Sequence, residues 1–214
     1  MRSFGHITAR YVFCRLLDTC YRKQHADHPW LTPQAIRILI DWVRCTDRGI
    51  EWGSGKSTAW FAQRIEHLVS IEHDLIWYER TLTWLVRNGL SSRVEQRLLP
   101  LRREVERKDS GEVVTHQPYV TVVNEYCDES FDFALVDGRL RHLCTAMVLP
   151  KIRPGGLLIL DNSERYIPSE GMNWHSTNAI ARQEWQSVLV TLNRWRTIET
   201  TNGVWRTRFW IKPC

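Results

Sequence analysis

The feature that most constrains the fold is a regular alternation of short β-rich runs with helical segments, which begins near residue 48. Short segments at 48–52, 68–72 and 94–98 are predicted to be strands, and the apolar runs at 131–137 and 156–161 predict two buried strands. Helical spacing predicts helices at 57–64 and 77–88. Strands and helices that alternate at this length predict an α/β fold with a doubly wound, mostly parallel sheet.

The two ends of the chain add elements to this core. Apolar positions at helical spacing in residues 8–44 predict two N-terminal helices, and Thr32-Pro33 is a typical helix start. After a helix near 179–193, two β-rich segments at 195–201 and 204–211 are joined by Asn202-Gly203, which is a strong hairpin signal. These two segments bring the predicted sheet to seven strands.

Length and composition favour one globular domain without disulfides. A chain of 214 residues can bury a sufficient core by itself. We expect residues 1–44 to form the N-terminal helices, 45–162 the binding core, and 163–214 a substrate loop, a helix and the hairpin. The six cysteines are scattered and no signal peptide or membrane-spanning run stands out, so we expect a cytoplasmic protein with no membrane partner.

The net charge of +5 is modest, and the arginines are spread along the chain. No nucleic-acid-binding motif accompanies them, so a nucleic-acid partner is not expected. The charged run at 102–109 is expected to be a solvated helix end or loop without a function of its own. The sequence leaves open whether the protein forms a homo-oligomer.

The segment GIEWGSGKST contains GSGKST, which suggests a phosphate-binding loop. That motif requires G-x-x-x-x-G-K-[ST], and its first glycine would fall on Ile50. The available glycine, Gly49, comes one residue too early. A nucleotide-using kinase or NTPase therefore stays an alternative, and a binding module without catalysis is another.

The same residues also fit E-x-G-x-G-x-[ST]. In this interpretation Glu51 ends the first strand, Gly53 and Gly55 form the turn, and Ser57 opens the following helix. Glycines in such a turn let the backbone approach a ligand closely. Glu72 lies 21 residues after Glu51 (72 − 51 = 21) at the end of the second strand, where an acidic residue can bind ribose hydroxyls.

Four of the five predicted core strands end at an acidic residue: Glu51, Glu72, Asp137 and Asp161. On this pattern and the glycine turn, the chain resembles the class I S-adenosylmethionine-dependent methyltransferases over residues 49–162. The resemblance implies a Rossmann-like methyltransferase fold with an antiparallel C-terminal strand, and S-adenosylmethionine as the cofactor. It also implies that the glycine turn holds the methionine portion, that Glu72 binds the ribose, and that His73 and residues 98–99 flank the adenine. The implied cofactor-binding residues are Glu51, Gly53, Ser54, Gly55, Ser57, Glu72, His73 and Asp137.

Methyl transfer is an in-line displacement, and a hydroxyl acceptor also needs a base or a metal that promotes its deprotonation. Asp137 follows the fourth strand, and Asp161 with Asn162 follows the fifth. This set resembles the metal-dependent catechol and caffeoyl-CoA type O-methyltransferases, which implies that these three residues hold a divalent metal such as magnesium. The lysine base of catechol-type enzymes is missing after Asp137, so Asp137, Arg139 and His142 are the catalytic candidates.

The acceptor is expected to be a small molecule or glycan that is methylated on oxygen. Arg139 and Arg141 could bind an anionic or sugar acceptor, because guanidinium groups hold carboxylates and phosphates through two parallel hydrogen bonds. The polar, aromatic loop at 163–178 follows the fifth strand, where a substrate would enter. The acceptor-binding candidates are Arg139, Arg165, Tyr166, Trp174 and His175.

Overall fold

The computed structural model describes residues 8–101, 105–108, 111–114, 118–168 and 183–214. Its centre is a seven-stranded sheet with the order β3-β2-β1-β6-β7-β9-β8. The strands are β1 (Arg48–Trp52), β2 (His67–Glu72), β3 (Val94–Leu98), β6 (Phe131–Val136), β7 (Ile152–Asp161), β8 (Arg196–Thr201) and β9 (Arg206–Ile211).

The five strands of the predicted core run parallel to one another. The C-terminal strand β9 lies between β7 and β8 and is antiparallel to both. Chain order reverses where β1 meets β6, so this point is the topological switch of the sheet, where ligands bind in open α/β folds. The predicted mostly parallel, seven-stranded sheet with an antiparallel C-terminal strand is confirmed.

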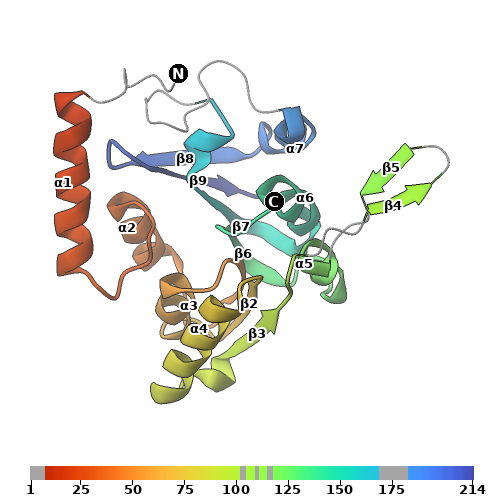
Figure 1. The fold of residues 1–214 in the computed structure, drawn as a ribbon, viewed down its shortest axis with the longest axis horizontal. Coiled ribbons are helices and arrows are strands. Elements are labelled where there is room, and N and C mark those ends of the chain that lie inside the picture. The colour runs from red at the N-terminus through yellow and green to blue at the C-terminus, as the bar shows by residue number, and fades with distance from the viewer. Residues whose placement is uncertain (1–7, 102–104, 109–110, 115–117, 169–182) are drawn as a thin grey trace.

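Helices cover both faces of the sheet (Figure 1). One hydrophobic core joins α2, α3 and α4 to one face, and a second joins α5, α6 and α7 to the other. The doubly wound arrangement is therefore confirmed. The α-helices are α1 (Ala9–Gln24), α2 (Pro33–Trp42), α3 (Lys56–Ala62), α4 (Leu75–Arg87), α5 (Pro118–Thr121), α6 (Arg141–Val148) and α7 (Gln186–Leu192), and short 3₁₀ turns include η4 (Ser163–Arg165).

The two predicted N-terminal helices are present. Thr32 caps α2 by accepting a hydrogen bond from the backbone of Ala35, with Pro33 in the first turn. Helix α1 packs against the turn between β8 and β9, where Asn202 Nδ2 donates to Asp18 Oδ1 at 2.9 Å. This contact brings the N-terminal helix to the same end of the molecule as the C-terminal hairpin (Figure 1).

One sequence expectation was wrong. Residues 105–108 of the charged run form strand β4 (Val105–Lys108), which pairs antiparallel with β5 (Gly111–Val114). The hairpin comes between β3 and α5 in the chain, and Figure 1 shows it projecting away from the main sheet. The run had no alternating apolar pattern to indicate a strand, because its residues are almost all charged.

Across the residues that the structure describes, no helix combines the length and the apolar character needed to cross a membrane.

Candidate functional site

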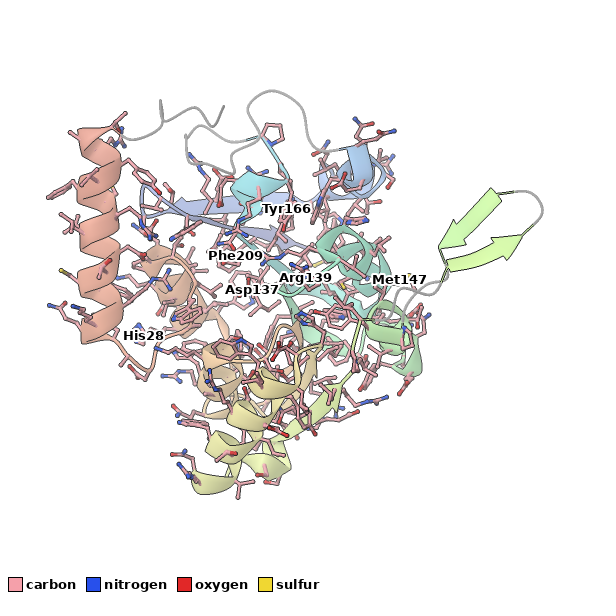
Figure 2. All side chains as sticks on the ribbon, viewed as in Figure 1. His28, Asp137, Arg139, Met147, Tyr166 and Phe209 are labelled. Carbon is pink, nitrogen blue, oxygen red and sulfur yellow. The ribbon has the colours of Figure 1, made fainter. Side chains whose placement is uncertain are left out.

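A cavity of about 610 Å³ opens at the carboxyl ends of β1, β2 and β6. It lies at the topological switch of the sheet and has the size of a small-molecule site. Ten of the residues predicted to bind cofactor or acceptor line it: Gly53, Ser54, Gly55, Ser57, Glu72, His73, Asp137, Arg139, Arg165 and Tyr166. Figure 2 shows Asp137, Arg139 and Tyr166 gathered at this end of the sheet.

Gly53 is required by the shape of the turn. Its φ of +102° lies in the region that favours glycine, and a Cβ there would meet the backbone of Gly138 at 3.1 Å. A Cβ at Gly55 would instead have no heavy atom within 4 Å, because that side of the turn faces open space in the cavity. The two glycines thus have different roles: Gly53 packs against the loop after β6, and Gly55 leaves room for a ligand.

Glu72 is buried at the end of β2, and its carboxylate organises the cavity wall. Oε2 accepts a hydrogen bond from the backbone of Ser54 at 2.8 Å. Oε1 accepts from the backbones of His73 at 2.7 Å and Asp74 at 2.8 Å. The carboxylate therefore links the glycine turn to the start of α4 while still facing the cavity.

Glu51 differs from the other acidic residues because it is fully buried and does not line the cavity. Its Oε1 accepts hydrogen bonds from the hydroxyls of Thr58 and Ser70, and Ser70 in turn contacts Ser54 Oγ at 2.7 Å. Burial raises the pKa of Glu51 to about 7. The structure thus places Glu51 behind the glycine turn, where it supports the turn's conformation.

Asp137 is paired with Arg141, a buried residue at the start of α6. Arg141 Nη2 donates to Asp137 Oδ1 at 2.8 Å, and the same guanidinium donates to the carbonyls of Asp137, Gly138 and Asp161. Burial raises the pKa of Asp137, and the charge of Arg141 opposes this rise. Sequence reasoning noted Arg141 only as a partner for an acceptor, whereas it fixes the strand ends of β6 and β7.

The donor set does not fit the predicted metal site at Asp137, Asp161 and Asn162. The cation beside these carboxylates is the guanidinium of Arg141, and Asp161 Oδ1 accepts a hydrogen bond from Thr207 at 2.8 Å. No group of three His, Cys, Asp or Glu side chains within the described ranges is arranged to hold an ion. The expectation of a divalent metal is therefore not supported.

The remaining acceptor and catalytic candidates are placed as follows. Arg139 and Tyr166 line the cavity, and Tyr166 stacks on Trp185 at 5.5 Å. His142 lies on α6 and lines neither this cavity nor the neighbouring one described below. Trp174 and His175 lie outside the described residues.

Lys56 lines the cavity, but its ammonium group is already bound to a backbone carbonyl of another segment. Its Nζ donates to the carbonyl of Ala26 at 2.6 Å and lies 5.9 Å from the ring centre of Trp30. The side chain therefore joins α3 to the segment before α2. This geometry gives no support to the nucleotide-binding alternative.

Sequence reasoning missed two tryptophans at the edge of the cavity. Trp30 and Trp77 both line it, and their rings meet edge to face at 6.1 Å. They come from the segment before α2 and from the first turn of α4. The cavity also includes Leu101, just beyond the 98–99 region expected to flank an adenine. The sequence contains eleven tryptophans, an unusually high number, but their count did not indicate which rings lie at the site.

A second cavity, of about 500 Å³, adjoins the first and shares three residues with it: Trp30, Asp137 and Arg165. Its other walls come from α1, from the end of β7 and from the C-terminal hairpin. The lining residues outside the shared three are Arg15, Asp18, Thr19, Arg22, Lys23, Asp161, Asn162 and Trp205.

No protein-family model matches the chain, and no curated protein matches it significantly in sequence. Solved structures are similar to it in fold. A methyltransferase from Geobacter sulfurreducens gives a TM-score of 0.56 at 14% identity, over 94% of this chain and 89% of that one.

Two further solved structures show the same architecture. A protein from Streptococcus mutans, assigned as a methyltransferase and solved in complex with SAH (S-adenosylhomocysteine), gives a TM-score of 0.55 at 10% identity, over 84% of this chain and 96% of that one. A SAM-dependent O-methyltransferase from Thermotoga maritima gives 0.53 at 15% identity, over 86% of this chain and 66% of that one. With the strand order and the switch-point cavity, these likenesses show that the chain has the fold of the class I S-adenosylmethionine-dependent methyltransferases.

Proposed function

We propose that the protein is an S-adenosylmethionine-dependent methyltransferase that acts on an oxygen atom of a small molecule. The observation that carries this proposal is the position of Glu72: a buried carboxylate that faces the cavity while holding the glycine turn by a 2.8 Å hydrogen bond. The fold of the neighbouring structures agrees with this assignment.

The residues of the cavity fit this cofactor. The carboxylate of Glu72 accepts three backbone hydrogen bonds and has acceptor capacity left for ribose hydroxyls. The open side of Gly55 leaves space for a chain that runs along the turn. His73, Trp77 and Leu101 supply flat or apolar surface for an adenine ring.

The cofactor, when bound, supplies an electrophilic methyl group on a sulfonium. The protein then has to align an acceptor with that methyl group and exclude water. Asp137 lines both cavities, so an acceptor in the second cavity would reach the first one beside this carboxylate. The side chain of Asp137 is 31% exposed, which leaves its carboxylate accessible to an acceptor.

Asp137 is the group that we assign to proton transfer from an acceptor hydroxyl. Burial raises the pKa of Asp137, so its carboxylate is a stronger base than that of an exposed aspartate. Arg141 holds the carboxylate in place through a 2.8 Å contact. The Thermotoga maritima structure is named an O-methyltransferase, which also favours oxygen as the acceptor atom.

Equilibrium dialysis with radiolabelled S-adenosylmethionine tests the proposal. We expect the wild-type protein to bind one equivalent. Glu72→Gln should weaken binding at least tenfold, because the single carbonyl oxygen of an amide cannot accept three backbone N–H bonds and a ribose hydroxyl as the carboxylate does. Glu66→Gln is the matched control, since Glu66 is exposed and lines neither cavity. Equal binding by the wild type and Glu72→Gln would contradict the role of Glu72, and no binding by the wild type would refute the proposed function.

A further inference from the structure

The second cavity is lined by more charged groups than the first. Four cationic side chains face it, from Arg15, Arg22, Lys23 and Arg165. Three carboxylates also line it, from Asp18, Asp137 and Asp161. Whether the cavity attracts an anion therefore depends on which of these charges are already compensated within its walls.

Asp18 and Arg22 compensate each other. Arg22 Nε lies 3.0 Å from both carboxylate oxygens of Asp18, one turn earlier on α1. Asn202 also donates to Asp18 at 2.9 Å. Asp18 is buried, so this pair belongs to the contact between α1 and the C-terminal hairpin and adds no net charge to the cavity.

The other two carboxylates contribute little free negative charge. Asp137 is paired with Arg141 at 2.8 Å. Asp161 is buried, and its Oδ1 accepts a hydrogen bond from Thr207. Burial and the nearby Asp137 raise the pKa of Asp161 well above its usual range, which favours its neutral form.

The cations that remain are Arg15 and Lys23, both on α1. Within the described part of the chain, Arg15 and Lys23 make no ion pair. The guanidinium groups of Arg15 and Arg165 each lie 5.5 Å from the ring centre of Trp205, so one indole holds both arginines at the cavity wall. The arrangement presents positive charge around an aromatic surface, and guanidinium groups bind carboxylates and phosphates through parallel hydrogen bonds.

We propose that the second cavity binds the anionic group, a carboxylate or a phosphate monoester, of a small-molecule acceptor. Arg15 and Lys23 are the binding groups, and Trp205 is the surface against which the acceptor packs. Calling this ligand a methyl acceptor rests on the proposed methyltransferase function. The anion site itself does not depend on that function. Because Asp137 lies in both cavities, an acceptor anchored by its anion would present its remaining atoms toward the first cavity.

Nuclear magnetic resonance of the ¹⁵N-labelled protein tests this site through the indole N–H signal of Trp205, identified with Trp205→Phe. Benzoate, phenyl phosphate and the neutral isostere benzamide are titrated, each with and without S-adenosylhomocysteine. We expect both anions to shift the Trp205 signal, and the ratio of their dissociation constants distinguishes a carboxylate site from a phosphate site. Benzamide should bind at least tenfold more weakly.

Variants show whether the cavity cations cause this preference. Arg15→Gln should weaken anion binding at least fivefold, and Arg15→Lys should retain most of it. Arg194→Gln is the matched control, because Arg194 is exposed and lines neither cavity. Equal affinity for benzoate and benzamide, no shift of Trp205 with either anion, or unchanged affinity in Arg15→Gln would each overturn the proposal.

The same samples keep this proposal separate from the proposed function. Binding of S-adenosylhomocysteine is measured by calorimetry before the titrations. If the protein binds the anions at Trp205 but not S-adenosylhomocysteine, the methyltransferase assignment fails and the anion site stands. If it binds S-adenosylhomocysteine but neither anion, the anion site fails and the methyltransferase assignment stands.

Discussion

At the scale of single residues, the buried carboxylate of Glu51 makes stability depend on pH. Its pKa rises from 4.5 to about 7 on folding, chiefly because burial disfavours the charged form. An acid with a raised folded-state pKa stabilises the fold most at low pH, and this contribution is lost as the pH rises from 4.5 to about 7. Since a tenfold change in proton affinity is worth about 1.4 kcal/mol, the loss amounts to roughly 3 kcal/mol.

Glu51→Gln should remove this pH dependence. We expect the free energy of unfolding of the variant, relative to the wild type, to rise by up to roughly 3 kcal/mol between pH 4.5 and pH 7.5. Urea denaturation at several pH values measures the difference. Glu66→Gln should show no such trend because its side chain is exposed. A constant difference between wild type and Glu51→Gln across this range would contradict the buried, titrating Glu51.

The sequence predicted single residues well where one motif fixes their position. Gly53, Gly55 and Glu72 were predicted from the glycine turn and the offset of 21 residues, and the structure brings all three to one cavity. Arg141 and Trp30 could not be assigned in this way. Their positions depend on how α6 and the segment before α2 pack against the sheet, and sequence spacing does not encode such long-range contacts.

At the scale of elements, the guanidinium of Arg141 joins the ends of β6 and β7, in the place where the sequence had suggested a metal ion. We therefore expect the thermal midpoint of unfolding and the affinity for S-adenosylhomocysteine to be the same in excess EDTA and in millimolar Mg²⁺. Differential scanning calorimetry and titration calorimetry measure the two quantities. A rise in either with Mg²⁺ that disappears in Asp137→Asn but persists in Asp128→Asn would show that an ion does bind at these strand ends.

Elements were predictable where a strand is buried. Strands β1, β2, β3 and β6 all fall within one residue of their predicted bounds. The buried strands β2 and β6 are the clearest cases, because strands covered on both faces need largely continuous apolar sequence. The hairpin β4–β5 was missed because its first strand consists mostly of charged residues. Strand β7 begins at Ile152, earlier than predicted, since Pro154-Gly155 suggested a turn.

At the scale of the whole molecule, both cavities are built from segments far apart in the chain. The first combines the glycine turn with residues 29–31 and 165–166, and the second combines α1 with the C-terminal hairpin. The fold class followed from local patterns of strands and helices. The cavities did not, because the contact between α1 and the hairpin rests on Asp18 and Asn202, which are 184 residues apart.

Titration calorimetry with S-adenosylhomocysteine and with Mg²⁺-ATP, on the unmodified protein, tests the central claim most directly. The cavity at the glycine turn, with Glu72 at its wall and Lys56 directed to the carbonyl of Ala26, predicts one site for S-adenosylhomocysteine and no heat of binding for ATP. Binding of ATP without binding of S-adenosylhomocysteine would contradict the account.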